Sequence, residues 1–121
     1  MTPVDLEALP TPPHCTADFC LVPLGTSSAS VSNEIAAVQR LMKQSGLTYS
    51  LHSAGTTVEG PWDEVMRVIG QAHSMLHASG VTRCHTDIRV GSRTDKKESY
   101  VEKVKAVERL LAKGSEGTAS E

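Results

Sequence analysis

Glu59 is the residue whose type and position most directly suggest chemistry. It lies in Gly55-Thr56-Thr57-Val58-Glu59-Gly60, a short segment that predicts a β-strand turning into a helix at Gly60-Pro61. Side chains alternate between the faces of a strand, so Thr57 and Glu59 share one face and Val58 lies on the other. A carboxylate at this point could bind a cation or an amine, and the Thr57 hydroxyl could hydrogen-bond a polar ligand.

An ion pair with Arg89 or Arg83 is the alternative role for Glu59. Both roles stay open at this point. They differ electrostatically, because a partly buried ion pair lowers the pKa of a carboxyl group, whereas an empty apolar pocket raises it.

Other polar side chains are candidates for the same pocket. Ser28 belongs to a hydroxyl-rich loop of residues 26–30, which could hold a small polar ligand or could simply form a turn and cap a helix. The loop is not a P-loop, since the required glycines and lysine are absent. His52 and Asp87 lie on two predicted strands. The candidate ligand-binding residues are therefore Ser28, His52, Thr57, Glu59 and Asp87.

Catalytic and metal chemistry have weaker support. His52 or His85 could act as a general base, but no nucleophile with an orienting partner accompanies them. Cys84 and His85 are strand neighbours and point to opposite faces. His14 and Cys15 supply only two of the four ligands of a closed metal site. We expect a protein that is not an enzyme, with no catalytic residue, no metal site and no required cofactor.

Composition excludes several classes of protein. The chain of 121 residues fits one domain, and its net charge of −2, with acids and bases mixed, argues against nucleic-acid binding. No apolar run approaches the roughly 20 residues that span a bilayer, so we expect no membrane partner. Three cysteines without a CxxC pair indicate free thiols, and we expect a cytoplasmic protein.

Hydrophobic periodicity and helix caps predict the order of the elements. Ser32 and Ser99 are expected N-caps, Gly46 and Gly114 expected helix ends, and Pro61 an expected first helical residue. The predicted elements are a strand at 17–25, a helix at 32–45, strands at 48–52 and 55–59, a helix ending near 79, a strand at 82–90 and a helix from 99 to 114.

This order predicts an α+β, ferredoxin-like βαββαβ antiparallel sheet with an additional C-terminal helix. Residues 1–16 are expected to form a proline-rich tail, 17–113 the domain and 114–121 a disordered tail. Right-handed crossovers place the first two helices on one face of the sheet. We expect Phe19, Leu51, Val58 and Ile88 to lie beneath them.

The opposite, open face of the sheet should be half apolar and half polar. We interpret it as a subunit interface that encloses a small polar pocket, with a solvated face carrying salt bridges as the alternative. The residues assigned to this face are Cys20, Val22, Thr48, Ser50, His52, Thr57, Glu59, His85, Asp87 and Arg89.

Several segments also match a known family in order and spacing. They are Pro23-Leu24-Gly25-Thr26, Ser45-Gly46-Leu47-Thr48-Tyr49, Gly55 to Gly60 followed by Trp62-Asp63-Glu64-Val65, Ile88-Arg89-Val90 with Arg93-Thr94-Asp95-Lys96, and Glu102-Lys103-Val104. With these segments the chain resembles the thiamine-binding, YkoF-like protein family, formerly an uncharacterised family. The resemblance implies a ferredoxin-like fold that assembles into dimers and tetramers through its sheets, with thiamine or its pyrimidine moiety as the ligand of some members.

One departure from the family concerns the hairpin between the two central strands. Members commonly carry a methionine where this chain has Ala54, and His52 and Ser53 replace other residue types. If that hairpin borders the pocket, these replacements would change the choice of ligand.

The leading hypothesis is a non-enzymatic small-molecule binding protein. It would bind thiamine or a related aminopyrimidine on the open sheet face at a subunit interface, with Glu59 as the anion. It would self-associate through the sheet as a homodimer or homotetramer. The alternatives are a small oligomeric ferredoxin-like enzyme that uses His52 or His85 as general base, and a purely structural or regulatory oligomer.

Overall fold

The computed structural model describes the backbone of residues 2–119 and the side chains of residues 2–114. Its sheet has the order β2-β3-β1-β4 and is antiparallel throughout, which confirms the predicted ferredoxin-like α+β class. The elements of the described chain are β1 (Cys15–Leu24), α1 (Ser32–Ser45), β2 (Thr48–His52), β3 (Gly55–Gly60), α2 (Trp62–Ala78), β4 (Arg83–Gly91) and α3 (Tyr100–Ala119).

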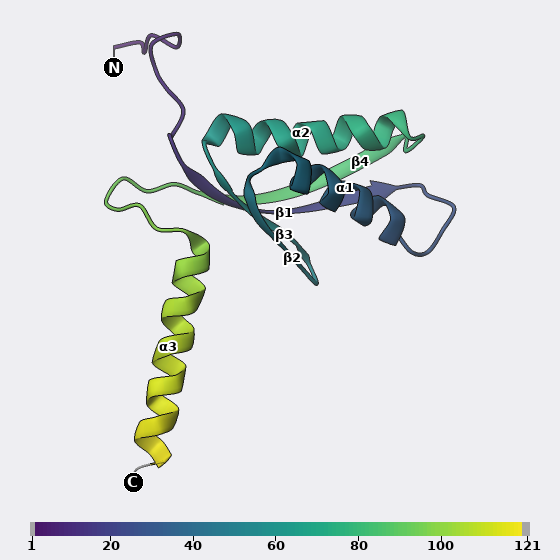
Figure 1. Ribbon diagram of the computed structural model, residues 1–121. Helices are drawn as coiled ribbons and strands as arrows, with labels where there is room; N and C mark the ends of the chain where they lie inside the picture. Colours follow the sequence, from purple (N-terminus) through teal and green to yellow (C-terminus); the bar gives the residue numbers. More distant parts are fainter. Residues whose placement is uncertain (1, 120–121) are drawn as a thin grey trace.

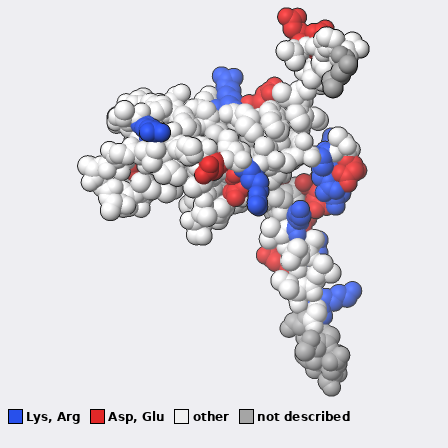
Figure 2. Space-filling model, turned by 180° about the vertical axis from the view of Figure 1, so that it is seen from behind, with Lys and Arg blue, Asp and Glu red and all other residues white. Residues whose placement is uncertain are grey.

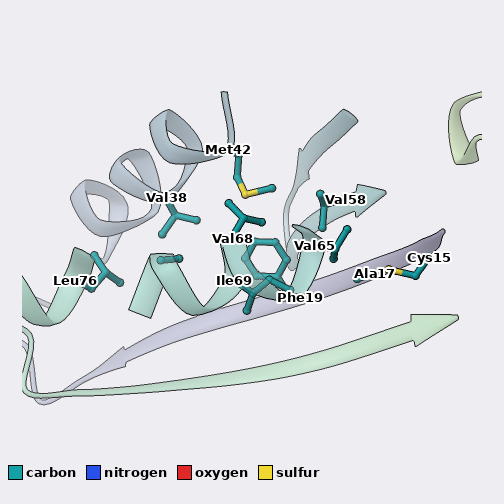
Figure 3. Packing of buried hydrophobic residues seen from close by; sticks show 11 residues of the cluster. Cys15, Ala17, Phe19, Val38, Met42, Val58, Val65, Val68, Ile69 and Leu76 are labelled. Atoms are coloured by element: carbon teal, nitrogen blue, oxygen red, sulfur yellow. The ribbon is translucent and has the colours of Figure 1, made fainter. Parts of the chain in front are cut away.

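The hydrophobic core lies between the sheet and two helices. Figure 1 shows α1 and α2 on the same side of the sheet, whereas α3 projects away from it. Phe19 of β1 and Val58 of β3 pack with Met42 of α1 and with Val65 and Leu76 of α2, and all five are 0–2% exposed (Figure 3). Burying a side chain of the size of Phe19 contributes roughly 1.5–3 kcal/mol, so this cluster fixes both helices over β1 and β3.

The helix boundaries confirm some of the expected caps and correct others. Gly46 ends α1 in the left-handed conformation, with φ of 75°, as expected for a C-terminal glycine. Ser32 is the first residue of α1 and not its cap, since Val31 precedes the helix and the Ser30 hydroxyl accepts the Ser32 N–H at 3.3 Å. Pro61 has a non-helical ψ of 137° and is therefore the N-cap of α2, with Trp62 as the first helical residue.

Strand register places the predicted residues on the expected faces, but the helices do not cover all of them. Phe19 pairs opposite Ile88, and Leu51 pairs opposite Thr56, so these residues share the helix side of the sheet. Leu51 and Ile88 are nevertheless 56% and 41% exposed, which corrects the expectation that helices bury them. They lie on the edge strands β2 and β4, where the cover of α1 and α2 is incomplete.

The open face carries the predicted mixture of residues. Cys20 pairs opposite Asp87, and Ser50 pairs opposite Thr57. Directly opposed residues of antiparallel strands point to the same side. The open face therefore combines apolar, hydroxyl and charged side chains, as the alternation predicted.

Segments near both ends of the described chain make defined contacts or form regular structure. Near the N-terminus, the Thr11 hydroxyl donates to Asp63 at 2.9 Å, and the Trp62 N–H donates to the Pro12 carbonyl at 3.4 Å. The proline-rich segment is thereby tied to the start of α2. At the other end, α3 continues through Gly114 to Ala119, so the predicted helix end is wrong. The division into a domain and two tails stays a prediction, and residues 120–121 lie outside the described chain.

Two simpler expectations concern cysteines and membranes. Cys15, Cys20 and Cys84 are all free thiols, as expected. No helix among the described residues combines the length and the apolar character needed to cross a membrane.

Candidate ligand-binding site

Glu59 does not form the ion pair considered from the sequence. Its side chain is 6% exposed, accepts hydrogen bonds from the Ser99 hydroxyl and, at 3.1 Å, from the Tyr100 backbone N–H, and lies 3.6 Å from His14 Nε2. These partners replace Arg89 and Arg83. The carboxylate thus lies at the positive end of the α3 dipole and satisfies N–H and hydroxyl donors at the beginning of that helix.

Tyr100 provides a second tether between α3 and the sheet. Its hydroxyl lies 2.7 Å from Ser50 Oγ on β2, while its backbone N–H binds Glu59 on β3. The first turn of α3 is therefore fixed to the open face at the Glu59 end of the two strands.

His52 is paired with Asp18, a residue outside the predicted set of ligand-binding residues. His52 Nδ1 accepts the Ala54 N–H at 3.2 Å, so its proton lies on Nε2, which donates to Asp18 Oδ1 at 2.6 Å. Both ring nitrogens are occupied, which disfavours His52 as a general base. The available signal was parity, because Asp18 is a charged residue on the same face of β1 as Cys20.

The remaining predicted residues lie apart. Glu59 pairs opposite Thr16 near the start of β1, whereas Ser28 follows the end of that strand at Leu24. At about 3.3 Å per residue, Thr16 and Leu24 are separated by roughly 26 Å along β1. Ser28 and Glu59 therefore cannot contact one small ligand within a single protomer.

Thr57 and Asp87 occupy different strands of the open face. Thr57 is partly buried on β3 between Asp18 and Ser50. Asp87 lies 3.5 Å from His85 on β4, and their side chains are 83% and 66% exposed. Four of the predicted residues, all but Ser28, lie on strands and face the open side of the sheet. One protomer does not bring all five into one pocket.

A broad groove lies beside Glu59, between the proline-rich segment and the loop after β4. Its lining residues are Pro10 to His14, Thr16, Glu59, Gly91 to Thr94 and Lys96 to Ser99.

Ion pairs occupy the loop after β4, where Arg93 bonds Asp95 at 2.5 Å and Lys96 lies 2.8 Å from Glu98. The hydrogen bond from Arg93 lowers the pKa of Asp95 to about 2, and the bond from Lys96 lowers the pKa of Glu98. Figure 2 shows basic and acidic groups intermixed beside the start of α3. Arg93 and Lys96 are therefore neutralised locally.

A smaller and mainly apolar cavity lies between α1 and the β2–β3 hairpin. Its volume is about 140 Å³. Apolar walls with few polar groups are typical of small-molecule sites. The lining residues are Phe19, Cys20, Leu21, Pro23, Glu34, Ile35, Val38, Gln39, Leu51, His52, Ser53, Ala54, Gly55, Thr56 and Leu76.

Strand lengths create this cavity. The pairing between β3 and β1 ends at Phe19 and Thr56, where the hairpin turns, but β1 continues to Leu24 alongside β4. Gly55 allows the hairpin to approach β1 closely, because a Cβ there would lie 2.5 Å from the Phe19 carbonyl oxygen. The space beyond the hairpin is then bounded by α1, whose residues Ile35, Val38 and Gln39 line it.

Gln39 is the most informative polar residue of the cavity. Its Nε2 donates to Thr56 Oγ1 at 3.0 Å, while its Oε1 is buried and has no hydrogen-bond partner among the described residues. A buried acceptor without a partner carries a desolvation cost of about 1–3 kcal/mol, which a ligand with an N–H donor would relieve. The sequence signal was a polar residue next to Val38 in the apolar stripe of α1.

Comparison with known proteins places the chain in a family. The model of the family described as "Thiamine-binding protein" matches residues 17–108. The chain belongs to the thiamine-binding protein family. This confirms the resemblance drawn from its segments. The family carries the name of a binding protein and not of an enzyme.

Relatives and solved structures agree with the assignment. The UPF0045 protein ECM15 of Eremothecium gossypii is 48% identical over 99 residues, covering 82% of this chain and 94% of the relative. A UPF0045 protein of Synechocystis is 42% identical over 94 residues, covering 78% and 77%. The crystal structure of a hypothetical protein from Methanocaldococcus jannaschii superposes with a TM-score of 0.70 at 28% identity, covering 78% of this chain and 96% of that one.

Proposed function

We propose that this protein binds thiamine, or a related aminopyrimidine, in the cavity between α1 and the β2–β3 hairpin. Membership of the thiamine-binding protein family supports the ligand class. The observation that carries the location is a small apolar cavity lined by Gln39, whose buried Oε1 has no hydrogen-bond partner within the described part of the chain.

The size of the cavity favours one ring of the ligand. Its volume of about 140 Å³ is close to that of an engineered protein cavity of about 150 Å³ that takes up benzene. One six-membered ring therefore fits, and thiamine as a whole does not. The aminopyrimidine enters the cavity, and the thiazolium ring stays at its mouth.

Chemical complementarity agrees with this orientation. Phe19, Val38 and Leu76 supply apolar walls for the pyrimidine ring. Gln39 also lines the cavity, and a small movement of its side chain would bring its buried Oε1 within reach of the amino group of the ring. Glu34 is a partly buried carboxylate of the same cavity, and it attracts the permanent positive charge of the thiazolium. Binding requires no catalytic group, in keeping with a non-enzymatic role.

The open-face pocket of Ser28, Thr57, Glu59 and Asp87 stays a separate prediction. It requires a second protomer, because Glu59 lies beside the beginning of β1 and Ser28 follows its end. His52 is common to both locations, since it lines the cavity and also bonds Asp18 of the open face.

Self-association through the sheet, as a homodimer or homotetramer, is part of the proposal, and α3 offers a further apolar surface for it. The described part of α3 exposes large apolar side chains that an isolated protomer leaves in water, and a second copy that covers them would gain hydrophobic stabilisation. These residues are Val104, Val107, Leu110 and Leu111, which are 53%, 52%, 69% and 69% exposed.

Calorimetric titration with thiamine and with its separate pyrimidine and thiazole halves tests the ligand. Ala54→Phe fills the cavity from the exposed hairpin and should abolish binding of thiamine and of the pyrimidine half. Ala36→Phe is the matched control, because it adds the same bulk to an exposed position of α1 outside the cavity lining.

Glu59→Gln separates the two locations. For a cavity site the thiamine affinity of this variant should stay within about twofold of wild type. Loss of binding in Glu59→Gln with full binding in Ala54→Phe would move the site to the open face. Absence of heat with thiamine and with both halves would reject the ligand class.

A further inference from the structure

We propose that His73 and His77 of α2 and Cys84 of β4 form a binding site for a zinc-class divalent metal ion. One ring nitrogen of each histidine and the sulfur of Cys84 all lie within 4.8 Å of one another. Two imidazoles and a thiolate are ligands that favour Zn²⁺ over oxygen-seeking ions such as Mg²⁺ or Ca²⁺. The site is independent of the proposed thiamine cavity.

The local fold brings these residues together. His73 and His77 are four residues apart on α2, so they project from the same face of the helix. A short turn after the helix leads directly into β4, with the Val81 N–H bonded to the Leu76 carbonyl at 3.0 Å. Cys84 then lies near the beginning of β4, on the side of the sheet that α2 covers.

Each histidine makes a hydrogen bond through one ring nitrogen. Metal-binding histidines usually make such a bond with the nitrogen that does not bind the metal. His77 Nδ1 lies 2.8 Å from the Val81 carbonyl oxygen, which can only accept. The proton is therefore on Nδ1, and the lone pair that binds a metal is on Nε2. His73 Nε2 lies 2.6 Å from the Thr86 hydroxyl, which orients that ring.

The spacing suits a tetrahedral ion after a small adjustment. With Zn–N near 2.0–2.1 Å and Zn–S near 2.3 Å, neighbouring ligand atoms lie roughly 3.3–3.7 Å apart. Closing the cluster from separations of up to 4.8 Å requires side-chain movements of about 1 Å. His77 is exposed, so solvent reaches the cluster and a water molecule can complete the fourth position.

The surrounding electrostatics are compatible with a cation. His77 belongs to the last turn of α2, where the helix dipole presents its negative end. Burial raises the pKa of the Cys84 thiol, so this group is protonated at neutral pH without an ion. Metal binding replaces that proton, which leaves to the solvent as the sulfur–metal bond forms.

Cobalt(II) is the probe for this site in the full-length chain. One equivalent of Co²⁺ should produce the visible bands of a tetrahedral ion together with sulfur-to-cobalt charge transfer, and Zn²⁺ should displace it. Cys84→Ser should remove the charge-transfer band and weaken Zn²⁺ binding at least tenfold. His77→Ala, at an exposed position, should weaken Zn²⁺ binding without unfolding the domain.

Controls on the open face make the outcome decisive. Cys20→Ser removes another partly buried thiol, and His85→Ala removes another exposed imidazole, and both should leave the cobalt spectrum unchanged. A spectrum that survives Cys84→Ser, or one that is lost in Cys20→Ser, would overturn the assignment. So would the absence of saturable Co²⁺ and Zn²⁺ binding by the wild-type chain.

Discussion

The carboxylate of Glu59, near the end of β3, lies 3.1 Å from the backbone nitrogen of Tyr100, the first residue of α3. The Ser99 hydroxyl donates to the same carboxylate and accepts the Val101 N–H at 3.2 Å. Two donors that a helix leaves unpaired at its beginning are thus satisfied, one locally and one from a distant strand. Glu59 therefore couples the sheet to the position of α3.

Glu59→Gln should loosen this connection. It keeps the shape of the side chain but removes the charge, and hydrogen bonds to charged groups contribute about 1.5–3 kcal/mol. We expect a loss of about 1–3 kcal/mol in the free energy of unfolding, measured by urea denaturation, with faster hydrogen exchange at Tyr100 and Val101. Glu64→Gln is the control, since it removes an exposed carboxylate from the first turn of α2. Equal losses in the two variants would contradict the capping role.

Gly55→Ala should destabilise the domain at the hairpin. The added Cβ would lie 2.5 Å from the carbonyl oxygen of Phe19, which is backbone and cannot rotate away. We expect a loss of about 1–3 kcal/mol in thermal or chemical unfolding, the usual cost of overpacking. Gly70→Ala is the matched control in α2, where nothing lies within 4 Å of the new atom. That variant should be neutral or stabilised by up to about 1 kcal/mol, because alanine favours helix. A Gly55→Ala variant as stable as wild type would refute the close approach.

The fold could be predicted from sequence because its determinants are local. Alternation assigned Thr57, Glu59 and Asp87 to one face of the sheet, and Gly46 marked the end of α1. The end of α3 was misjudged at Gly114, because a single glycine lowers helix stability without terminating the helix.

The candidate site was harder to predict, because it depends on relative strand lengths. Sequence order shows that Ser28 follows β1 and that Glu59 lies on β3, but only the register reveals that they lie near opposite ends of β1. The cavity exists because β1 continues beyond the hairpin at Gly55, and no local pattern reports that overhang. Gln39 was overlooked for a different reason, since a polar residue beside an apolar stripe of a helix normally faces solvent.

The ion pair of the loop after β4 should be visible in an acid titration. The hydrogen bond from Arg93 lowers the pKa of Asp95 from 3.8 to about 2. Because the folded-state pKa is depressed, the stabilisation is present above pH 3.8 and is lost as the pH falls toward 2. Arg93→Gln should raise the pKa of Asp95 toward 3.8, measured by NMR of the carboxyl carbon. Lys96→Gln, the control, removes the main cause of the lowered pKa of Glu98 and should move that of Asp95 less. An unchanged Asp95 titration in Arg93→Gln would contradict the pairing.

Leu111→Glu should weaken self-association through α3. Val104, Val107 and Leu111 recur at helical spacing on one stripe and are 53%, 52% and 69% exposed. We expect sedimentation equilibrium of the wild-type chain to give at least twice the protomer mass of 12.9 kDa, and the variant to shift toward the protomer. A buried charge at the stripe would be unpaired, which is the physical reason for dissociation. Ala112→Glu adds the same charge about 100° around the helix from Leu111 and should leave the mass unchanged. A monomeric wild-type chain, or a Leu111→Glu variant of unchanged mass, would show that the stripe is not an interface between copies.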